Sequence, residues 1–286
     1  MRPRTRLSTM GAKTMFHFLY DAYNGYRSRL DDILLVHEFL EEVPLKLGVK
    51  TVMPPFVLPY YNGVVPEDCG ISAFVFLAGG HFTLHTFSYR GAFFVDFLCP
   101  QDFERKRLHS LIDDVFPAER KFENYVNRTA GERLVRPAMD PKKDFGPHLL
   151  FDIDDYAGPD TMDGIFAYLD RLPSKVGMTP IIRPYVVKNR FARQEVVSGM
   201  TMIAESHIAL HVFKESRKAC FDLFSCSFFD TAKVPREIKK ELQGRIVHET
   251  LVSRGSKYKK YGESAAQKVK FSRAWLDTVF SGRSKI

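Results

Sequence analysis

The chain of 286 residues contains the sequence SAFVFLAGGHFTLHTF at residues 72–87 and the sequence SGMTMIAESHIALHVF at residues 198–213. The two stretches align without a gap, and each begins with serine and carries two histidines four residues apart. Self-similarity of this kind constrains a fold more strongly than local propensity does. The sequence therefore predicts two copies of one unit.

The similarity extends in both directions from this stretch. Downstream, FVDFLC at residues 94–99 resembles CFDLFSC at residues 220–226, with one residue gained or lost. Upstream, HFLYD at 17–21 resembles HLLFD at 148–152, and the segments that close the two copies also look related. The repeat therefore covers most of the chain.

Each copy is predicted to form an antiparallel sheet with helices on one face. Strand-like segments, rich in Val, Ile, Phe and Tyr, lie at about 15–22, 49–58, 71–79, 81–88 and 91–98, and again at about 148–154, 178–187, 197–205, 207–213 and 218–225. Helical patterns lie at 30–40 and 103–115, and again at 162–169 and 234–246. Because the open face of each sheet needs cover, we expect an α+β fold of two tandem repeats packed as a multilayer α/β sandwich.

The expected boundaries divide the chain into five segments. They are a flexible basic tail (1–14), the N-terminal repeat (15–117), a linker (118–147), the C-terminal repeat (148–255) and a basic tail (256–286). The linker is expected because Pro137, Pro141 and two adjacent lysines interrupt regular patterns there.

Composition narrows the class of protein. With 45% hydrophobic and 27% charged residues the chain can bury a core, and no apolar run approaches the roughly 20 residues of a membrane-spanning helix. The four cysteines show no zinc or disulfide spacing, and residues 1–14 lack the apolar part of a secretory signal, so a soluble cytoplasmic protein without a metal or membrane partner is expected. The net charge of +8 comes without a nucleic-acid motif, which favours solvated basic tails over a nucleic-acid surface.

The second copy combines hydroxyls, histidines, a carboxylate and a thiol in one region. These residues are Ser198, Glu205, Ser206, His207, His211 and Cys226. Singly, each has an ordinary structural explanation, since strand cysteines commonly act as small apolar groups and buried histidines can bond to the backbone. Their joint occurrence favours a catalytic site.

Strand geometry predicts that several of these side chains share one pocket within the second copy. Side chains eight residues apart in a strand, such as Ser198 and Ser206, point the same way. A tight reversal near His207 would then bring His211 back alongside them. Cys226, on a neighbouring strand, could reach the same pocket.

This pattern resembles the processing site of bacterial-type S-adenosylmethionine decarboxylases, which are pyruvoyl-dependent enzymes. The shared features are Glu-Ser-His, a second histidine four residues later, an Asp-x-x-x-Cys strand beyond, and a serine at position 198. The resemblance covers the second copy well and the first more loosely. It implies an arrangement in which the fused first copy takes the part that a second subunit plays in the small bacterial enzymes.

The resemblance implies that the chain cuts itself between Glu205 and Ser206. The Ser206 hydroxyl would attack the Glu205 carbonyl, Ser198 would hydrogen-bond the intermediate, and His211 would remove the α-proton for β-elimination. Residue 206 would become a covalent pyruvoyl group that forms a Schiff base with the substrate amine and accepts electrons as carbon dioxide leaves. Cys226 would return a proton to the resulting carbanion.

Three further residues are expected to bind the substrate. The resemblance implies that Phe191 stacks on adenine, that Asp152 lies near the substrate amine, and that His207 lines the pocket. The segment around Phe191 lacks the proline and glycine of the small bacterial members and carries added charges, which leaves the identity of the substrate open.

The first copy lacks the nucleophile, because Gly79 and Gly80 stand at the positions of Glu205 and Ser206. Ser72, His81 and His85 persist there, either as structural remnants or as contributors to the pocket of the other copy.

The leading interpretation is a zymogen that becomes a β chain (1–205) and an associated α chain from residue 206. It would decarboxylate S-adenosylmethionine for spermidine biosynthesis, and a homodimer is compatible with it. Two alternatives stay open: a pyruvoyl-dependent arginine or ornithine decarboxylase, and a non-enzymatic pseudoenzyme or nucleic-acid-binding protein. The presence or absence of self-cleavage separates the enzymes from the pseudoenzyme.

Overall fold

The computed structural model describes residues 15–60, 69–128, 139–140, 142, 144–204 and 206–256. The expected tail at 1–14, all of the expected C-terminal tail except residue 256, and Glu205 lie outside these residues. None of the helices in the described part is long and apolar enough to cross a membrane.

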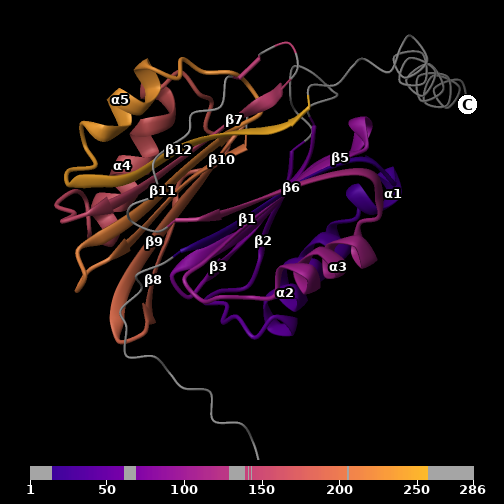
Figure 1. Ribbon diagram of the computed structural model, residues 1–286, viewed down its shortest axis with the longest axis horizontal. Coiled ribbons are helices and arrows are strands. Elements are labelled where there is room, and N and C mark those ends of the chain that lie inside the picture. Colours follow the sequence, from indigo (N-terminus) through magenta and orange to yellow (C-terminus); the bar gives the residue numbers. More distant parts are fainter. Residues whose placement is uncertain are drawn as a thin grey trace, which may run out of the picture.

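The first copy forms a six-stranded antiparallel sheet (Figure 1). Its strands are β1 (Phe16–Gly25), β2 (Phe56–Tyr60), β3 (Gly70–Leu77), β4 (Gly80–Phe87), β5 (Ala92–Cys99) and β6 (Ala118–Asn127), in the order β2-β3-β4-β5-β1-β6. Its helices are α1 (Arg27–Leu30), α2 (Ile33–Lys46) and α3 (Arg105–Val115), and a short 3₁₀ turn, η2 (Ser88–Arg90), links β4 to β5.

The second copy repeats this topology. Its strands are β7 (Asp144–Asp154), β8 (Tyr185–Phe191), β9 (Gln194–Ile203), β10 (Ser206–Phe213), β11 (Lys218–Ser225) and β12 (Arg245–Ser256), in the order β12-β7-β11-β10-β9-β8. Its helices are α4 (Met162–Lys175) and α5 (Lys233–Lys239). The order equals that of the first sheet once β7 is matched to β1 and β12 to β6. The predicted α+β sandwich of two tandem repeats is confirmed.

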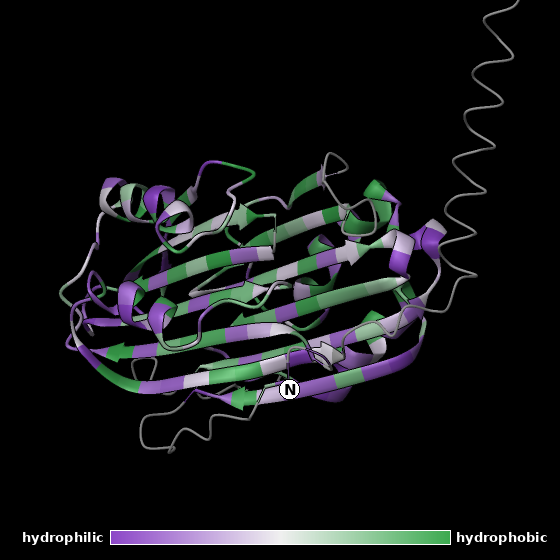
Figure 2. Cartoon of the chain, turned by 90° about the horizontal axis from the view of Figure 1, so that it is seen from above, coloured by the Kyte–Doolittle hydropathy of each residue, from purple (hydrophilic) through white to green (hydrophobic). Residues whose placement is uncertain are grey.

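The two sheets face each other, with the helices on the outside (Figure 1). Hydrophilic and hydrophobic residues alternate along many strands (Figure 2), and β10 illustrates the consequence. Ile208 and Leu210 belong to the core that includes residues of α4, whereas Ala209 packs with Phe74 and Phe76 of the facing sheet. Because each fully buried phenylalanine contributes about 1.5–3 kcal/mol, both layers stabilise the fold.

The segment 118–147 is not a linker over its whole length. β6 occupies its first ten residues and pairs with β1, and β7 begins at Asp144. The sequence of β6, AERKFENYVN, is highly charged and mostly exposed, as is typical of an edge strand protected against further pairing. Because the segment lacks the apolar alternation expected of a strand, it was not predicted as one.

The register also shows that no residue is gained or lost between the copies in β5 and β11. Thr83 pairs with Asp96 in the first sheet, and Ala209 pairs with Asp222 in the second. With these pairs matched, Cys99 corresponds to Ser225, and Cys226 corresponds to a proline of the first copy, Pro100. The thiol is therefore peculiar to the second copy.

Candidate active site

Ser206 begins β10 directly after a tight reversal of the chain. It pairs with Ile203, the last residue of β9. Its φ angle is 152°, in a region that L-residues rarely adopt and that costs on the order of 1–3 kcal/mol. The side chain is buried, with the residue 3% exposed, and its Oγ has no hydrogen-bond partner among the described residues. A strained residue with a free hydroxyl therefore stands at the predicted cleavage site.

Ser198 and His211 bond to each other but lie away from Ser206. The His211 Nδ1 is 2.9 Å from the Ser198 Oγ, and the two residues are directly opposite in the β9–β10 pair. His211 lies five positions after Ser206 on the same strand, which corresponds to about 17 Å at ~3.4 Å per residue. The single pocket expected within the second copy is not formed, because the reversal falls between 203 and 206 rather than near His207.

The first copy supplies the residues that meet this end of β10. The His207 Nδ1 lies 2.8 Å from the His85 Nε2, with the two rings nearly parallel, and the His85 Nδ1 lies 3.0 Å from the Ser72 Oγ. His85 is 1% exposed and His207 fully buried. Ser72 and His85 thus contribute to the region of Ser206, which was one of the two interpretations left open by the sequence.

The opposite end of the sandwich carries the matching arrangement without a nucleophile. There the His81 Nδ1 lies 2.8 Å from the His211 Nε2, and Ser198 completes the chain of hydrogen bonds. Gly80 stands where Ser206 stands in the second copy, and a Cβ there would lie 2.0 Å from the Leu98 carbonyl oxygen. No side chain fits at residue 80 without a backbone shift.

Cys226 lies at the same end as Ser206. It follows Ser225, which pairs with Ser206 across β10 and β11. Cys226 is half-buried against a cluster between the two sheets. The cluster consists of Tyr23, Phe87, Ala92, Phe94, Phe145 and Phe224. The structure therefore brings the expected nucleophile and the expected proton donor together beside aromatic rings.

Asp152 and Phe191 lie toward the other end. Phe191 pairs with Gln194, nine residues before Ile203 on β9, or about 30 Å at ~3.4 Å per residue. Asp152 accepts hydrogen bonds from Arg128, at 3.1 Å, and lies 2.9 Å from the His248 Nδ1. It also lines a small cavity of about 30 Å³. Neither residue is brought near Ser206.

Six buried histidines lie between the sheets: His17, His81, His85, His148, His207 and His211. Burial lowers the pKa of every one of them, because desolvation disfavours the charged imidazole. For His85 and for His211 the pKa falls to about 3, with a nearby arginine adding to the effect. All six are therefore neutral near pH 7, and a neutral imidazole can accept a proton.

Each copy contributes one buried arginine that donates hydrogen bonds to carboxylates of the other copy. Arg128, just after β6, donates to Asp152 and Asp222 of the second sheet, and Arg254, in β12, donates to Asp21 and Asp96 of the first. Neither arginine was predicted from the sequence, although the similarity of the closing segments would have aligned them.

Burial raises the pKa of Asp96 to about 6 and that of Asp222 to about 7, against the opposing effect of the neighbouring arginine. Each arginine therefore neutralises a carboxylate pair that would otherwise be costly to bury.

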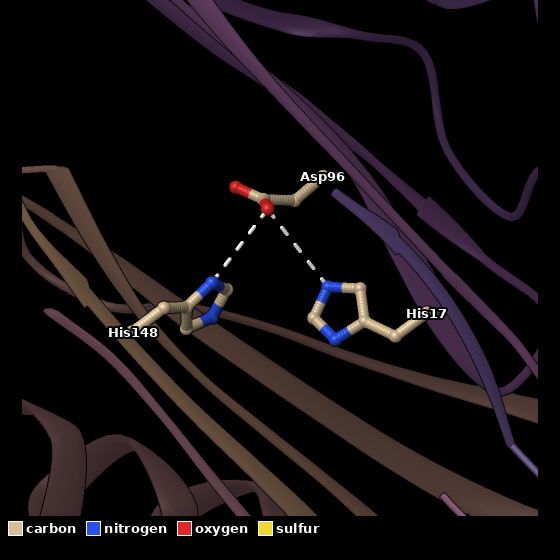
Figure 3. Close-up of side chains that lie close together, drawn as sticks. All are labelled: His17, Asp96 and His148. Carbon is tan, nitrogen blue, oxygen red and sulfur yellow. Dashed lines mark ion pairs between the residues drawn. The ribbon is translucent and has the colours of Figure 1, made fainter. Parts of the chain in front are cut away.

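Asp96 also lies between two histidines (Figure 3). Its Oδ1 is 3.9 Å from the His17 Nε2 and 3.7 Å from the His148 Nδ1. Three such ligands could hold a cation. However, the same oxygen accepts a hydrogen bond from Arg254 at 2.5 Å, and this guanidinium opposes the binding of a second positive charge. The group is better explained as part of the arginine network than as a metal site.

The site and the fold together define a duplicated two-sheet protein in which a strained serine, Ser206, precedes a histidine that bonds across the two repeats. A family model described as "S-adenosylmethionine decarboxylase" matches residues 16–129 and 148–255, once for each copy. The chain belongs to this family.

Several solved structures are similar to the chain, among them the following two. An adenosylmethionine decarboxylase from Aquifex aeolicus VF5 is 19% identical, with 42% of this chain and 94% of that chain covered and a TM-score of 0.36. An unknown protein from Galdieria sulphuraria is 10% identical, with 80% and 89% covered and a TM-score of 0.19. A comparison with curated proteins finds no match.

Proposed function

We propose that this chain is a self-cleaving, pyruvoyl-dependent decarboxylase that acts on S-adenosylmethionine. Family membership supports the reaction class. The observation that carries the proposal is Ser206 itself, which is buried and strained and whose hydroxyl makes no hydrogen bond to the described residues. Such a hydroxyl is available to attack a backbone carbonyl, and relief of the strain would favour the attack.

In the proposed cleavage, the Ser206 Oγ adds to the Glu205 carbonyl carbon and the bond to the Ser206 nitrogen breaks, leaving an ester. A base then removes the α-proton of residue 206, and the Glu205 carboxylate departs. Addition of water to the remaining dehydroalanine releases ammonia and leaves a ketone. Peptide and water are consumed, and a free carboxylate, a pyruvoyl end and ammonia are produced.

We assign the base to the first copy. His85 is neutral, is hydrogen-bonded to Ser72 and to His207, and is joined through His207 to the residue that reacts. His211, the base expected from the sequence, is about 17 Å further along the strand at ~3.4 Å per residue. Ser72, which is hydrogen-bonded to His85, then takes the part expected of Ser198, that of the serine that hydrogen-bonds the intermediate.

The surroundings of Cys226 favour an adenosyl substrate over arginine or ornithine. A ketone at residue 206 would supply an electron sink for decarboxylation. The cluster beside Cys226 is aromatic, the type of surface on which a purine stacks, and its rings are buried here, with Phe94 and Phe145 stacked on each other at a centroid distance of 4.3 Å. Cys226 would protonate the product. In this arrangement, Phe191 and Asp152 do not bind the substrate.

Denaturing mass spectrometry of the purified protein tests the proposal. We expect two fragments divided between residues 205 and 206, the smaller lacking a free amine. Ser206→Ala should give an intact, folded chain. The cleaved protein should release carbon dioxide from carboxyl-labelled S-adenosylmethionine and not from arginine or ornithine. An uncut wild-type chain, or cleavage of Ser206→Ala at the same bond, would contradict the proposal.

A further inference from the structure

Arg254 reaches from the second repeat into the first and is completely enclosed. Its Nε donates to the Asp21 Oδ1 at 2.8 Å and its Nη1 donates to the Asp96 Oδ1 at 2.5 Å, so that it binds carboxylates on β1 and β5. The Nη1 also lies 3.0 Å from the His148 Nδ1 on β7. Because these contacts use several edges of one planar guanidinium, its position is fixed.

The face of the same guanidinium lies against the strand that leads to Cys226. Its central carbon is 4.4 Å from the centroid of the Phe224 ring, a cation–π geometry. Phe224 is directly opposite His207 in the β10–β11 pair, and the next pair along is Ser225 with Ser206. Arg254 is thus in contact with the strand pair that carries the proposed nucleophile and proton donor.

Arg128 provides a natural comparison. It makes the equivalent bonds to Asp152 and Asp222, and it is also fully enclosed, with the residue 2% exposed. Arg128 lines the small cavity at the end of the sandwich away from Ser206. Phe213 also lines this cavity, and its ring is the neighbour that a Cβ added at Gly79 would approach. The two arginines are alike in burial and bonding and differ in which end of the sandwich they serve.

We infer that Arg254 is a positioning residue for the reaction at Ser206, acting through Phe224 and the paired strands to keep His85 bonded to His207. The inference rests on the proposed self-cleavage. The guanidinium also places a permanent positive charge close to these imidazoles and favours the neutral form that can accept a proton. The other charged or titratable groups that face this region are Asp21, Asp96, His17, His81, His148 and His211.

The test measures the rate of self-cleavage from pH 5 to pH 9 for the wild type, Arg254→Met, Arg254→Lys and Arg128→Met. We expect Arg254→Met to slow cleavage on the order of 10- to 100-fold, the scale of misplaced catalytic groups. The wild-type rate should not fall toward pH 5, because the pKa of His85 is about 3. The Arg254→Met rate should fall there, because removal of the cation eases protonation of the histidines. Lysine should restore the pH profile but not the rate, since it cannot bond to both carboxylates in the same plane. Arg128→Met should retain the wild-type profile.

Thermal unfolding of each variant identifies any that fail to fold, in which case Arg254→Lys is compared with Arg128→Lys. Cleavage of the Arg254 variants at the wild-type rate would overturn the inference while leaving the proposed function intact. Equal slowing by the Arg128 variants, with the same pH profile, would also overturn it, because the effect would then be general destabilisation. A wild-type chain that never cleaves would remove the proposed function and the inference together.

Discussion

Acidification from pH 8 to pH 5 should strongly destabilise the folded protein. The histidines between the sheets are neutral when folded, but in the unfolded chain they titrate near pH 6.5. Below that pH the unfolded state binds more protons, so the free energy of unfolding falls as pH falls. Each imidazole whose folded pKa lies well below 5 should cost about 2 kcal/mol at pH 5 relative to pH 8.

The two buried aspartates act in the opposite direction. Asp96 and Asp222 have raised pKa values, about 6 and about 7, so the folded protein holds protons that the unfolded chain releases. Together they stabilise the fold by about 4 kcal/mol at pH 5 relative to pH 8, which offsets His85 and His211. The other four histidines leave a net loss of up to about 8 kcal/mol, comparable with the whole stability of an ordinary domain.

Urea unfolding at pH 8, 7, 6 and 5, followed by fluorescence and circular dichroism, measures this loss. His17→Gln should reduce the difference between pH 8 and pH 5 by up to about 2 kcal/mol, since it removes one buried imidazole whose pKa is lowered by burial. His37→Gln is the matched control, because His37 is on the surface of α2 with its side chain 40% exposed, and it should leave the difference unchanged. An unfolding free energy that stays constant, or rises, toward pH 5 would refute the reasoning.

Three further outcomes are expected from single substitutions. His85→Gln should slow self-cleavage by about 10²- to 10⁴-fold, the usual contribution of a general base. His211→Gln should change the rate at most a few-fold. Gel time courses measure both rates, and a larger effect of His211→Gln would contradict the assignment. Cys226→Ala should cleave normally but lose decarboxylation by a similar factor, measured as carbon dioxide release, and full activity would exclude the thiol as donor. Gly80→Ser should lower the melting temperature without creating a second cut, because its Cβ would collide with the Leu98 carbonyl; a new cut before residue 80 in mass spectrometry would show that a serine fits there.

The fold could be predicted because duplication carries more information than propensity. The ungapped match between 72–87 and 198–213 identifies corresponding strands in the two copies. Each sheet has two buried faces, one packed against helices and one against the other sheet. β6 was missed because its exposed face is charged, and an edge strand needs little apolar surface to pair.

The part of the candidate site that lies within one repeat could be predicted from the sequence, and the contacts between the two repeats could not. Ser206 and Cys226 lie at the same end of the sheet because neighbouring strands of one hairpin lead to them, and hairpin pairing is a local property. The proposed base, His85, and its serine, Ser72, could not be predicted in this way. His85 and His211 occupy equivalent positions in the two copies, and their contacts across the interface depend on how the sheets face each other, which no periodicity within one sheet encodes.

Cleavage before residue 206 would divide the second sheet between two chains without separating them. β7, β8 and β9 would remain with the first copy, while β10, β11 and β12 would belong to the new chain. In the order β12-β7-β11-β10-β9-β8 the strands of the two chains interleave, so three hydrogen-bonded strand boundaries join them. Arg254 would then lie on one chain and its partners Asp21 and Asp96 on the other. The same cross-repeat contacts that build the site would therefore keep the cleaved chains together as one folded unit.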